Sequence, residues 1–540
     1  MVTPHGRARA TSSGPLPVTG LPSPDLRTCS SQQLRVACGP TGATAGLTPP
    51  RANTPHDGKA AATPEGRLRA PPRRQRGIER VGDSGSGAAV PPVTERLQGL
   101  FTRFGRAHST NTLSIATNAI WLFVDRASRI VIALVLGSWV ARHLGPERYG
   151  LLAFTLTVYA FLQILVSLGL DGVAVREMTQ RRVEERVSVG VILTLRFVMA
   201  MVGLVGVTLY VAFVSAGEEA RWILLAAALA LPFFAADSFD FWFQSRSENR
   251  VVVQLRFRAT LLSSAFRVLL ILVSAPIYLF AAAVAVDAAA VAYLLARAYK
   301  RNGGPRPLSF SPAQAADLLR ESWPLLLAAL ATTVYMRIDQ LLVLRYLGDA
   351  ALGQYAAAVT LSTAPYVLSL LVQTSVLPFF STLHQRDPAL FANRLQLLFD
   401  LSAAVGAFMA LSLVFMSGPV VRLLLGAQYA PTAGIMAIYA FTNVFVFLGV
   451  AQLVWITVER RSSVSLAKTV IGAVAAIVLN WQLLPRFGMT GGALAAVGTQ
   501  FISAVLCNAF LAPEIFRMQV RALFPLHRAR ALLSVRGGWG

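Results

Sequence analysis

Arginine side chains inside apolar segments are the feature of this sequence with the clearest chemical meaning. An arginine at the centre of a membrane-spanning helix costs roughly 2.5–3.5 kcal/mol on insertion scales. A chain keeps several only where they face water, pair with an acid or bind an anion. The seven arginines inside or close to such segments are Arg126, Arg129, Arg196, Arg256, Arg258, Arg267 and Arg337.

Arginine is suited to binding phosphate at membrane depth, because its guanidinium stays protonated and presents a planar fork to oxyanions. Several such groups in one low-dielectric cavity fit a diphosphate better than a neutral sugar or an organic cation. We therefore expect a cationic substrate-binding cavity lined by Arg126, Arg129, Arg256, Arg267 and Arg337.

Four carboxylates in the same segments are candidates for a coupling-ion site or for structural ion pairs: Asp125, Asp240, Asp287 and Asp339. Asp125 lies four residues before Arg129, on one face of a helix, which favours a fixed ion pair. Asp237 and Asp240 begin an acidic stripe that could neutralise the arginines of the next segment. Asp339 shares its helical face with Thr332 and Tyr335 but not with Arg337, so it is the preferred candidate for a change of protonation.

The composition places most of the chain in a lipid bilayer. Of its 540 residues, 55% are hydrophobic and 14% are charged, and mean hydropathy is +0.56, whereas soluble domains carry about 25% charged residues. The net charge of +23 is spread over short loops and forms no basic domain, which argues against nucleic-acid binding. The three cysteines and six histidines have no metal-ligand spacing, and no cofactor is expected.

Hydropathy predicts an all-α integral membrane protein with about twelve transmembrane helices. The expected spans are 112–140, 150–170, 187–214, 221–243, 250–273, 276–297, 322–344, 352–379, 394–417, 432–457, 464–483 and 489–512. The corresponding domains are a Pro/Gly/Ala-rich basic tail expected to be disordered (1–108), a six-helix lobe (109–298), a cytoplasmic linker (299–321), a second six-helix lobe (322–513) and a basic amphipathic tail (514–540).

The distribution of basic residues predicts the orientation. With both termini inside, the inner loops carry about fifteen arginines and lysines and the outer loops carry only Arg142, Arg148, Arg221, Arg345, Arg422 and Arg486. Such an excess marks the cytoplasmic side. We therefore expect a multi-pass protein of a bacterial cytoplasmic membrane with both termini in the cytoplasm.

An internal repeat relates the two predicted lobes. ArgHisLeuGlyProGluArgTyrGly begins at Arg142 and ArgTyrLeuGlyAspAlaAlaLeuGly begins at Arg345, an offset of about 203 residues. Each copy connects the first span of its lobe to the second. Repeated six-span lobes are a known transporter plan, with the substrate site between them near the midplane of the membrane.

Five stretches resemble polysaccharide-unit (O-antigen-type) flippases of the multidrug/oligosaccharidyl-lipid/polysaccharide exporter superfamily. The most specific is TyrMetArgIleAspGlnLeuLeuVal at 335–343; the others lie at 144–154, 167–177, 239–248 and 479–495. Ser245 departs from the family pattern, which usually has glycine there. The resemblance covers roughly 110–512 and leaves the N-terminal tail outside.

The resemblance implies a transporter that moves a polyprenyl-diphosphate-linked oligosaccharide across the membrane by alternating access. A proton or a sodium ion is a possible coupling partner, and polysaccharide-assembly proteins are possible partners. Other interpretations remain open, among them a non-transporting scaffold or assembly partner. A drug or cation antiporter of the same superfamily predicts an acid-dominated lumen, whereas bases outnumber acids in the core spans of the first half. A membrane polysaccharide polymerase or ligase needs a long outer loop, and no outer loop exceeds about fifteen residues by the predicted spans.

Overall fold

The computed structural model describes residues 111–180, 183–213 and 217–524, and the side chains of 111–131 and 133 lie outside this description. All regular structure in this part of the chain is helical. Backbone polar groups have no water to bond in a bilayer core, and a helix satisfies them within one segment. The N-terminal tail predicted for 1–108 and the last residues of the C-terminal tail, 525–540, fall outside the described residues.

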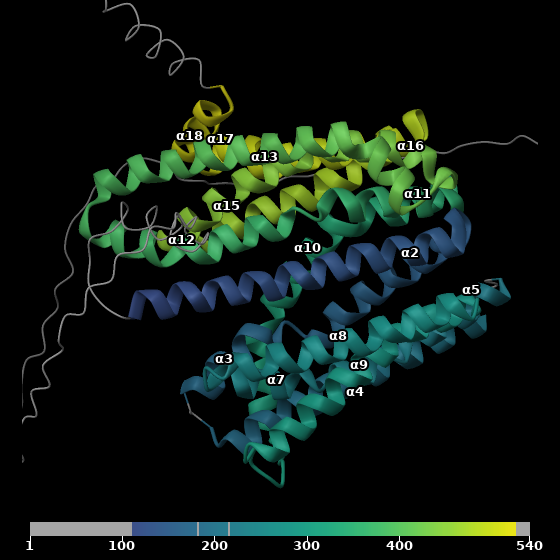
Figure 1. Ribbon diagram of the computed structural model, residues 1–540. Helices are drawn as coiled ribbons and strands as arrows, with labels where there is room; N and C mark the ends of the chain where they lie inside the picture. The colour runs from purple at the N-terminus through teal and green to yellow at the C-terminus, as the bar shows by residue number, and fades with distance from the viewer. Residues whose placement is uncertain (1–110, 181–182, 214–216, 525–540) are drawn as a thin grey trace, which may run out of the picture. The chain divides into compact units, whose positions relative to one another are not determined.

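The first half of the described chain runs from α2 to α9. The bounds are α2 (Asn111–Ser167), α3 (Leu170–Gln180), α4 (Glu185–Phe213), α5 (Glu218–Ala228), α6 (Leu231–Phe234), α7 (Asp237–Ser245), α8 (Asn249–Leu272) and α9 (Ile277–Arg301). Helices α5 and α8 both pack against α9, and Figure 1 shows α4, α5, α8 and α9 grouped together.

The second half runs from α10 to α18. The bounds are α10 (Pro312–Leu347), α11 (Asp349–Thr363), α12 (Tyr366–Arg386), α13 (Pro388–Leu424), η1 (Ala427–Tyr429), α14 (Ala430–Tyr439), α15 (Thr442–Val458), α16 (Ser462–Phe501), η2 (Ile502–Leu506), α17 (Asn508–Leu511) and α18 (Pro513–Leu523). Helix α15 packs against α13 and α16, and α10 against α16, as Figure 1 also shows.

Within the described residues, the helices account for the twelve predicted passes. Nine helical runs are long and apolar enough to span a membrane. Helix α2 divides at Gly145 and α16 divides at Gly488, where the backbone leaves the helical region. Each of these two divisions adds one pass to the nine. Helix α8, which carries several arginines and is not among the nine runs, is the twelfth pass. The chain is a multi-pass membrane protein.

The predicted repeat is present in the backbone. Gly145 has φ 76° and ψ 168°, and Gly348 has φ 82° and ψ −178°. Both therefore adopt nearly the same left-handed, extended conformation, which glycine enters without a Cβ penalty. They occupy equivalent places in the two copies of the repeat, between the first and second passes of each half.

The connection between the halves is shorter than the sequence predicted and packs against the first half. Helix α10 begins at Pro312, ten residues before the expected start of the second lobe at 322. Leu318 is buried in an apolar cluster with residues of α3, α4 and α7, and Gln314 Nε2 donates to Ser188 Oγ at 3.0 Å. Pro324 lies inside α10, which continues through it as one helix.

The C-terminal helix α18 is part of the packed structure. Ile515 and Gln519 are buried, and the helix contacts α13 and α17. Gln519 Oε1 accepts from Asn508 Nδ2 at 2.9 Å, and Gln519 Nε2 donates to the Ala504 carbonyl at 2.8 Å. The exposed Arg517 and Arg521 lie on the opposite face, so α18 is amphipathic.

Candidate functional site

Both halves contain interrupted helices at membrane depth. The fourth pass consists of α5, α6 and α7, with breaks at Leu229–Ala230 and Ala235–Ala236. The tenth pass, its counterpart in the second half, breaks at Ala440–Phe441 between α14 and α15. The backbone at these residues keeps helical dihedral angles, and most of the amides there bond to the carbonyl three residues earlier, so each break is a local tightening of a continuous helix.

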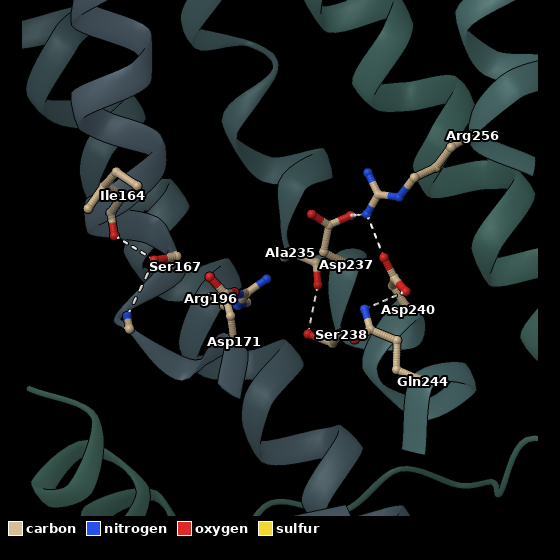
Figure 2. Close-up of polar contacts among 11 residues, drawn as sticks. Ile164, Ser167, Asp171, Arg196, Ala235, Asp237, Ser238, Asp240, Gln244 and Arg256 are labelled. Atoms are coloured by element: carbon tan, nitrogen blue, oxygen red, sulfur yellow. Dashed lines mark hydrogen bonds and ion pairs between the residues drawn. The ribbon is translucent and has the colours of Figure 1, made fainter. Parts of the chain in front are cut away.

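The break in the fourth pass positions an ionic cluster. Asp237 and Asp240 lie in the first turn of α7. One Arg256 nitrogen, Nη2, donates to Asp237 Oδ1 at 2.7 Å and to Asp240 Oδ2 at 2.8 Å. Gln244 Nε2 donates to Asp240 Oδ1 at 2.9 Å. Figure 2 shows the guanidinium of α8 between the two carboxylates of α7.

A fully buried arginine lies near this cluster. The Arg196 side chain is fully buried and forms an ion pair with Asp171, in the first turn of α3. Its guanidinium carbon lies 4.7 Å from the Phe241 ring centroid and 5.3 Å from that of Phe234. Arg196 Nε and Nη1 have no hydrogen-bond partner among the described residues. In this part of the first half, two arginines therefore form ion pairs with three aspartates.

Asp287 has partners within its own half. It interacts electrostatically with Arg267 and Arg256 and lies near Ser263. Ser263 is buried, whereas Asp287 and Arg267 are half-buried. The aspartate of α9 is thus partly balanced by arginines of α8, the neighbouring helix.

In the second half, Asp339 is buried without an ion-pair partner among the described residues. Its Oδ2 accepts from the Tyr355 hydroxyl at 2.8 Å, and its Oδ1 accepts from the Gln340 backbone N–H at 2.8 Å. Charge-assisted hydrogen bonds of this kind contribute about 1.5–3 kcal/mol each. Arg337, two residues away, interacts with it only at longer range.

A small cavity with both polar and apolar lining adjoins Asp339. Its volume is about 20 Å³, and its lining includes Tyr439, Asn480, Thr499 and Gln500. Asn480 Oδ1 and Thr499 Oγ1 are buried and have no hydrogen-bond partner among the described residues. A cavity of this size holds one water molecule or one small cation. The lining oxygens of α10 and α16 are the ligand type that hard cations prefer.

Comparison with known proteins agrees with this architecture. Residues 115–384, half of the chain, match the model of a family described as "Polysaccharide biosynthesis protein". The chain belongs to this family. A curated relative from Shigella dysenteriae, named "Putative O-antigen transporter", is 21% identical over 185 residues. That match covers 34% of this chain and 46% of the relative, so the chain spans under half of that protein's length.

Solved structures of transporters share the fold of this family member. The lipid II flippase MurJ in an inward closed conformation has a TM-score of 0.57 at 13% identity, covering 76% of this chain and 93% of that chain. An inward-facing multidrug resistance MATE family transporter of the MOP superfamily has a TM-score of 0.54 at 15% identity, covering 72% and 95%. These likenesses show that this chain has the same fold as those transporters.

The structure brings together only some of the predicted site residues. Arg256 joins Asp240, and Arg267 lies near Asp287, but these pairs are in the first half, whereas Arg337 and Asp339 are in the second. Arg337 is half-buried and forms no ion pair among the described residues. Asp125, Arg126 and Arg129 lie in helix α2, and their side chains fall outside the described residues. The common cationic cavity therefore stays a prediction.

Sequence reasoning missed several polar groups that complete these sites. Arg196 was one of the seven arginines, but its pairing with Asp171 was not predicted. Asn480 lies in a stretch that resembles the flippase family, and Thr499 follows soon after it, yet neither carries a charge. No stripe on one helix links the two residues, because the break at Gly488 places them in different passes of α16.

Proposed function

We propose that this protein flips a polyprenyl-diphosphate-linked oligosaccharide unit across a bacterial cytoplasmic membrane for polysaccharide biosynthesis. The observation that carries this proposal is the combination of the family match with arginines retained at membrane depth on both halves of a flippase-like fold. The asymmetry of basic residues supports a cytoplasmic location for both termini. Polysaccharide-assembly proteins are the expected partners in the membrane.

In this mechanism, arginines bind the diphosphate. The two lobes then move relative to each other, so that the binding site opens first to one side of the membrane and then to the other. Arg126, Arg129, Arg267 and Arg337 are the proposed diphosphate ligands, because no carboxylate forms an ion pair with Arg267 or Arg337 among the described residues. Arg256 is a weaker candidate, since its guanidinium already binds Asp237 and Asp240. A low-dielectric setting strengthens the attraction of a guanidinium such as that of Arg337 for phosphate oxygens.

A drug or cation antiporter is the main alternative, because transporters named for multidrug resistance share the fold. An antiporter of this type needs unpaired carboxylates in its cavity to bind a cationic substrate. In the first half, Asp171, Asp237 and Asp240 all form ion pairs with arginine, which leaves Asp339 of the second half as the buried carboxylate that such an antiporter would use. This pairing favours the anionic, lipid-linked substrate.

The proposed transport activity is tested with purified protein in vesicles that carry a fluorescent polyprenyl-diphosphate oligosaccharide. Arg337→Ala should reduce flipping at least tenfold, and Arg337→Lys should recover only part of it, because lysine keeps the charge and loses the planar fork. Arg422→Ala is the matched control, since Arg422 is an exposed arginine of the second half. Flipping at the unmodified rate in Arg337→Ala, with the control unchanged, would remove Arg337 from the substrate site.

We also propose that a coupling cation binds beside Asp339. The aspartate supplies the negative charge, and the unpartnered oxygens of Asn480 and Thr499 supply neutral ligands. Sodium fits this donor set, because all the ligands are oxygens and the cavity has room for one ion. Protonation of Asp339 is the competing mode of coupling.

Sodium and proton coupling are separated by measuring ²²Na⁺ binding and flipping under imposed gradients. Thr499→Val should weaken sodium binding about tenfold, and Asp339→Asn should abolish it while preserving the shape of the side chain. Thr469→Val is the control, because that hydroxyl of the same helix bonds to the Ser465 carbonyl at 2.9 Å. A response to pH gradients alone, unaffected by Thr499→Val, would assign coupling to the proton.

A further inference from the structure

A lysine inside the second half takes no part in the sites described above. Lys468 lies in the second turn of α16 and is half-buried. Its Nζ donates to Gln452 Oε1 at 3.0 Å, and the Gln452 side chain is fully buried. A lysine near the end of a span often extends its ammonium to the membrane surface. Here the hydrogen bond directs the ammonium into the protein instead.

Lys468 occupies the place in the second half that Arg256 occupies in the first. Arg256 lies in the fifth pass, 16 residues after its partner Asp240 in the fourth. Lys468 lies in the eleventh pass, 16 residues after its partner Gln452 in the tenth. The two pairs are therefore equivalent members of the internal repeat, and the carboxylate of the first half is an amide in the second.

This exchange leaves the charge of Lys468 unbalanced. In the first half, Asp237 and Asp240 both form ion pairs with the equivalent arginine. In the second half, Gln452 replaces one aspartate, and Gly449, three residues before it, stands in the place of the other. Among the described residues, no carboxylate forms an ion pair with Lys468. Its ammonium therefore keeps a positive charge that the protein does not cancel.

A chain of buried amides supports this charge. Gln452 Nε2 donates to Asn508 Oδ1 at 2.6 Å, and Asn508 Nδ2 donates to Gln519 Oε1 at 2.9 Å. Gln519 Nε2 ends the chain at the Ala504 carbonyl, at 2.8 Å. An ammonium can only donate, so its bond fixes the orientation of each amide that follows. Every amide then presents its oxygen on the side of the lysine, and hydrogen bonds aligned in this way polarise one another.

The amide chain stabilises a charged lysine without neutralising it. The side chains of Gln452, Asn508 and Gln519 are all fully buried, so no water replaces their dipoles. A carboxylate in the same place would stabilise the ammonium and cancel its charge, as happens in the first half. A cation that is stabilised by dipoles alone still attracts an anion, and phosphate oxygens accept strong hydrogen bonds from an ammonium.

We propose that Lys468 binds a phosphate group of an anionic ligand, and that Gln452, Asn508 and Gln519 position its ammonium for this contact. The inference deepens the proposed function and rests on it, because the phosphate is then one of the two in the lipid-linked substrate. An anionic phospholipid headgroup offers the same chemistry, and the choice of lipid probe separates the two sources.

The sharpest variant is Gly449→Asp, which supplies a carboxylate in the place equivalent to Asp237. A Cβ at Gly449 meets no atom within 4 Å, so the new side chain has room. Its carboxylate should pair with Lys468 and weaken phosphate binding about tenfold, as should Lys468→Gln, because each removes a hydrogen bond between charged groups. Gly449→Asn has the same shape without the charge and should bind as the unmodified protein does.

Binding is measured on full-length protein in a neutral detergent with two fluorescent probes, a polyprenyl diphosphate without a glycan and a phosphatidylglycerol. Weaker binding of the polyprenyl diphosphate assigns the site to the substrate. Weaker binding of phosphatidylglycerol alone assigns it to a lipid headgroup and contradicts the role in substrate binding. Unchanged affinity for both probes in Gly449→Asp and Lys468→Gln would overturn the proposal. Equal losses in Gly449→Asp and Gly449→Asn would also overturn it, because added bulk would then be the cause.

Asn508→Leu tests the positioning role, because it breaks the amide chain and leaves Lys468 in place. It should weaken binding of the polyprenyl diphosphate about threefold in the unmodified protein and have no effect in a Lys468→Gln background, since the two residues act through one contact. Equal losses in both backgrounds would reduce the chain to a structural element. If the charge-dependent losses occur in a protein that flips no lipid-linked oligosaccharide in vesicles, the phosphate contact stands and the proposed function fails.

Discussion

Replacing either of two ion-paired arginines of the first half by methionine should have very different effects on stability. Arg256 binds two carboxylates whose side chains are only 14% and 10% exposed. Arg256→Met would leave Asp237 and Asp240 buried and close together without a counter-charge. Breaking a buried pair in this way costs about 3–5 kcal/mol.

Arg196→Met removes favourable and unfavourable contributions together. The Asp171 side chain is 64% exposed, so this ion pair is screened by solvent and contributes at most about 1 kcal/mol. Two cation–π contacts add about 0.5–2 kcal/mol each. Against them, burial of Nε and Nη1 without partners costs about 1–3 kcal/mol per group. We therefore expect a net change within about 2 kcal/mol.

The assay is thermal unfolding of the purified protein in one detergent, with aggregation followed by size-exclusion chromatography. Arg256→Met should lower the midpoint by several degrees more than Arg196→Met. Adding Asp237→Asn and Asp240→Asn to Arg256→Met should restore most of the loss, because the buried negative charges are removed. Equal losses in the two methionine variants, or no recovery in the triple variant, would refute this account of the charges.

Two further predictions concern packing. Gly190→Ala should destabilise the junction between α4 and the linker by about 1–3 kcal/mol, because its Cβ would lie 2.3 Å from the Ser309 carbonyl oxygen. Gly206→Ala in the same helix has no atom within 4 Å and should be neutral or stabilising in the same unfolding measurement. Gln519→Leu should release α18, because it removes the hydrogen bonds to Asn508 and the Ala504 carbonyl. Its release is detected as faster tryptic cleavage within α18 while the rest of the protein stays intact.

The sequence by itself determined the membrane architecture. Apolar runs locate the helices because the bilayer requires each span to satisfy its own backbone. Two breaks that the hydropathy pattern predicted occur at Gly145 and Gly488. The repeat was also visible, because a left-handed turn at Gly145 and Gly348 needs the same residue in both copies. The family followed from short motifs that include Arg337 and Asp339.

The partners of the buried polar groups were decided only by the tertiary structure. Asp339 was a candidate from the sequence, but its contacts with Tyr355 and its cavity beside Thr499 depend on how α10, α11 and α16 pack. Likewise, the sequence shows that an arginine lies inside a span. It does not show whether the guanidinium binds a substrate or pairs with an aspartate. Arg256 and Arg337 have the same charge, yet only Arg256 forms an ion pair with a carboxylate among the described residues. Helical periodicity fixes which face a side chain occupies, but helix packing determines what that face meets.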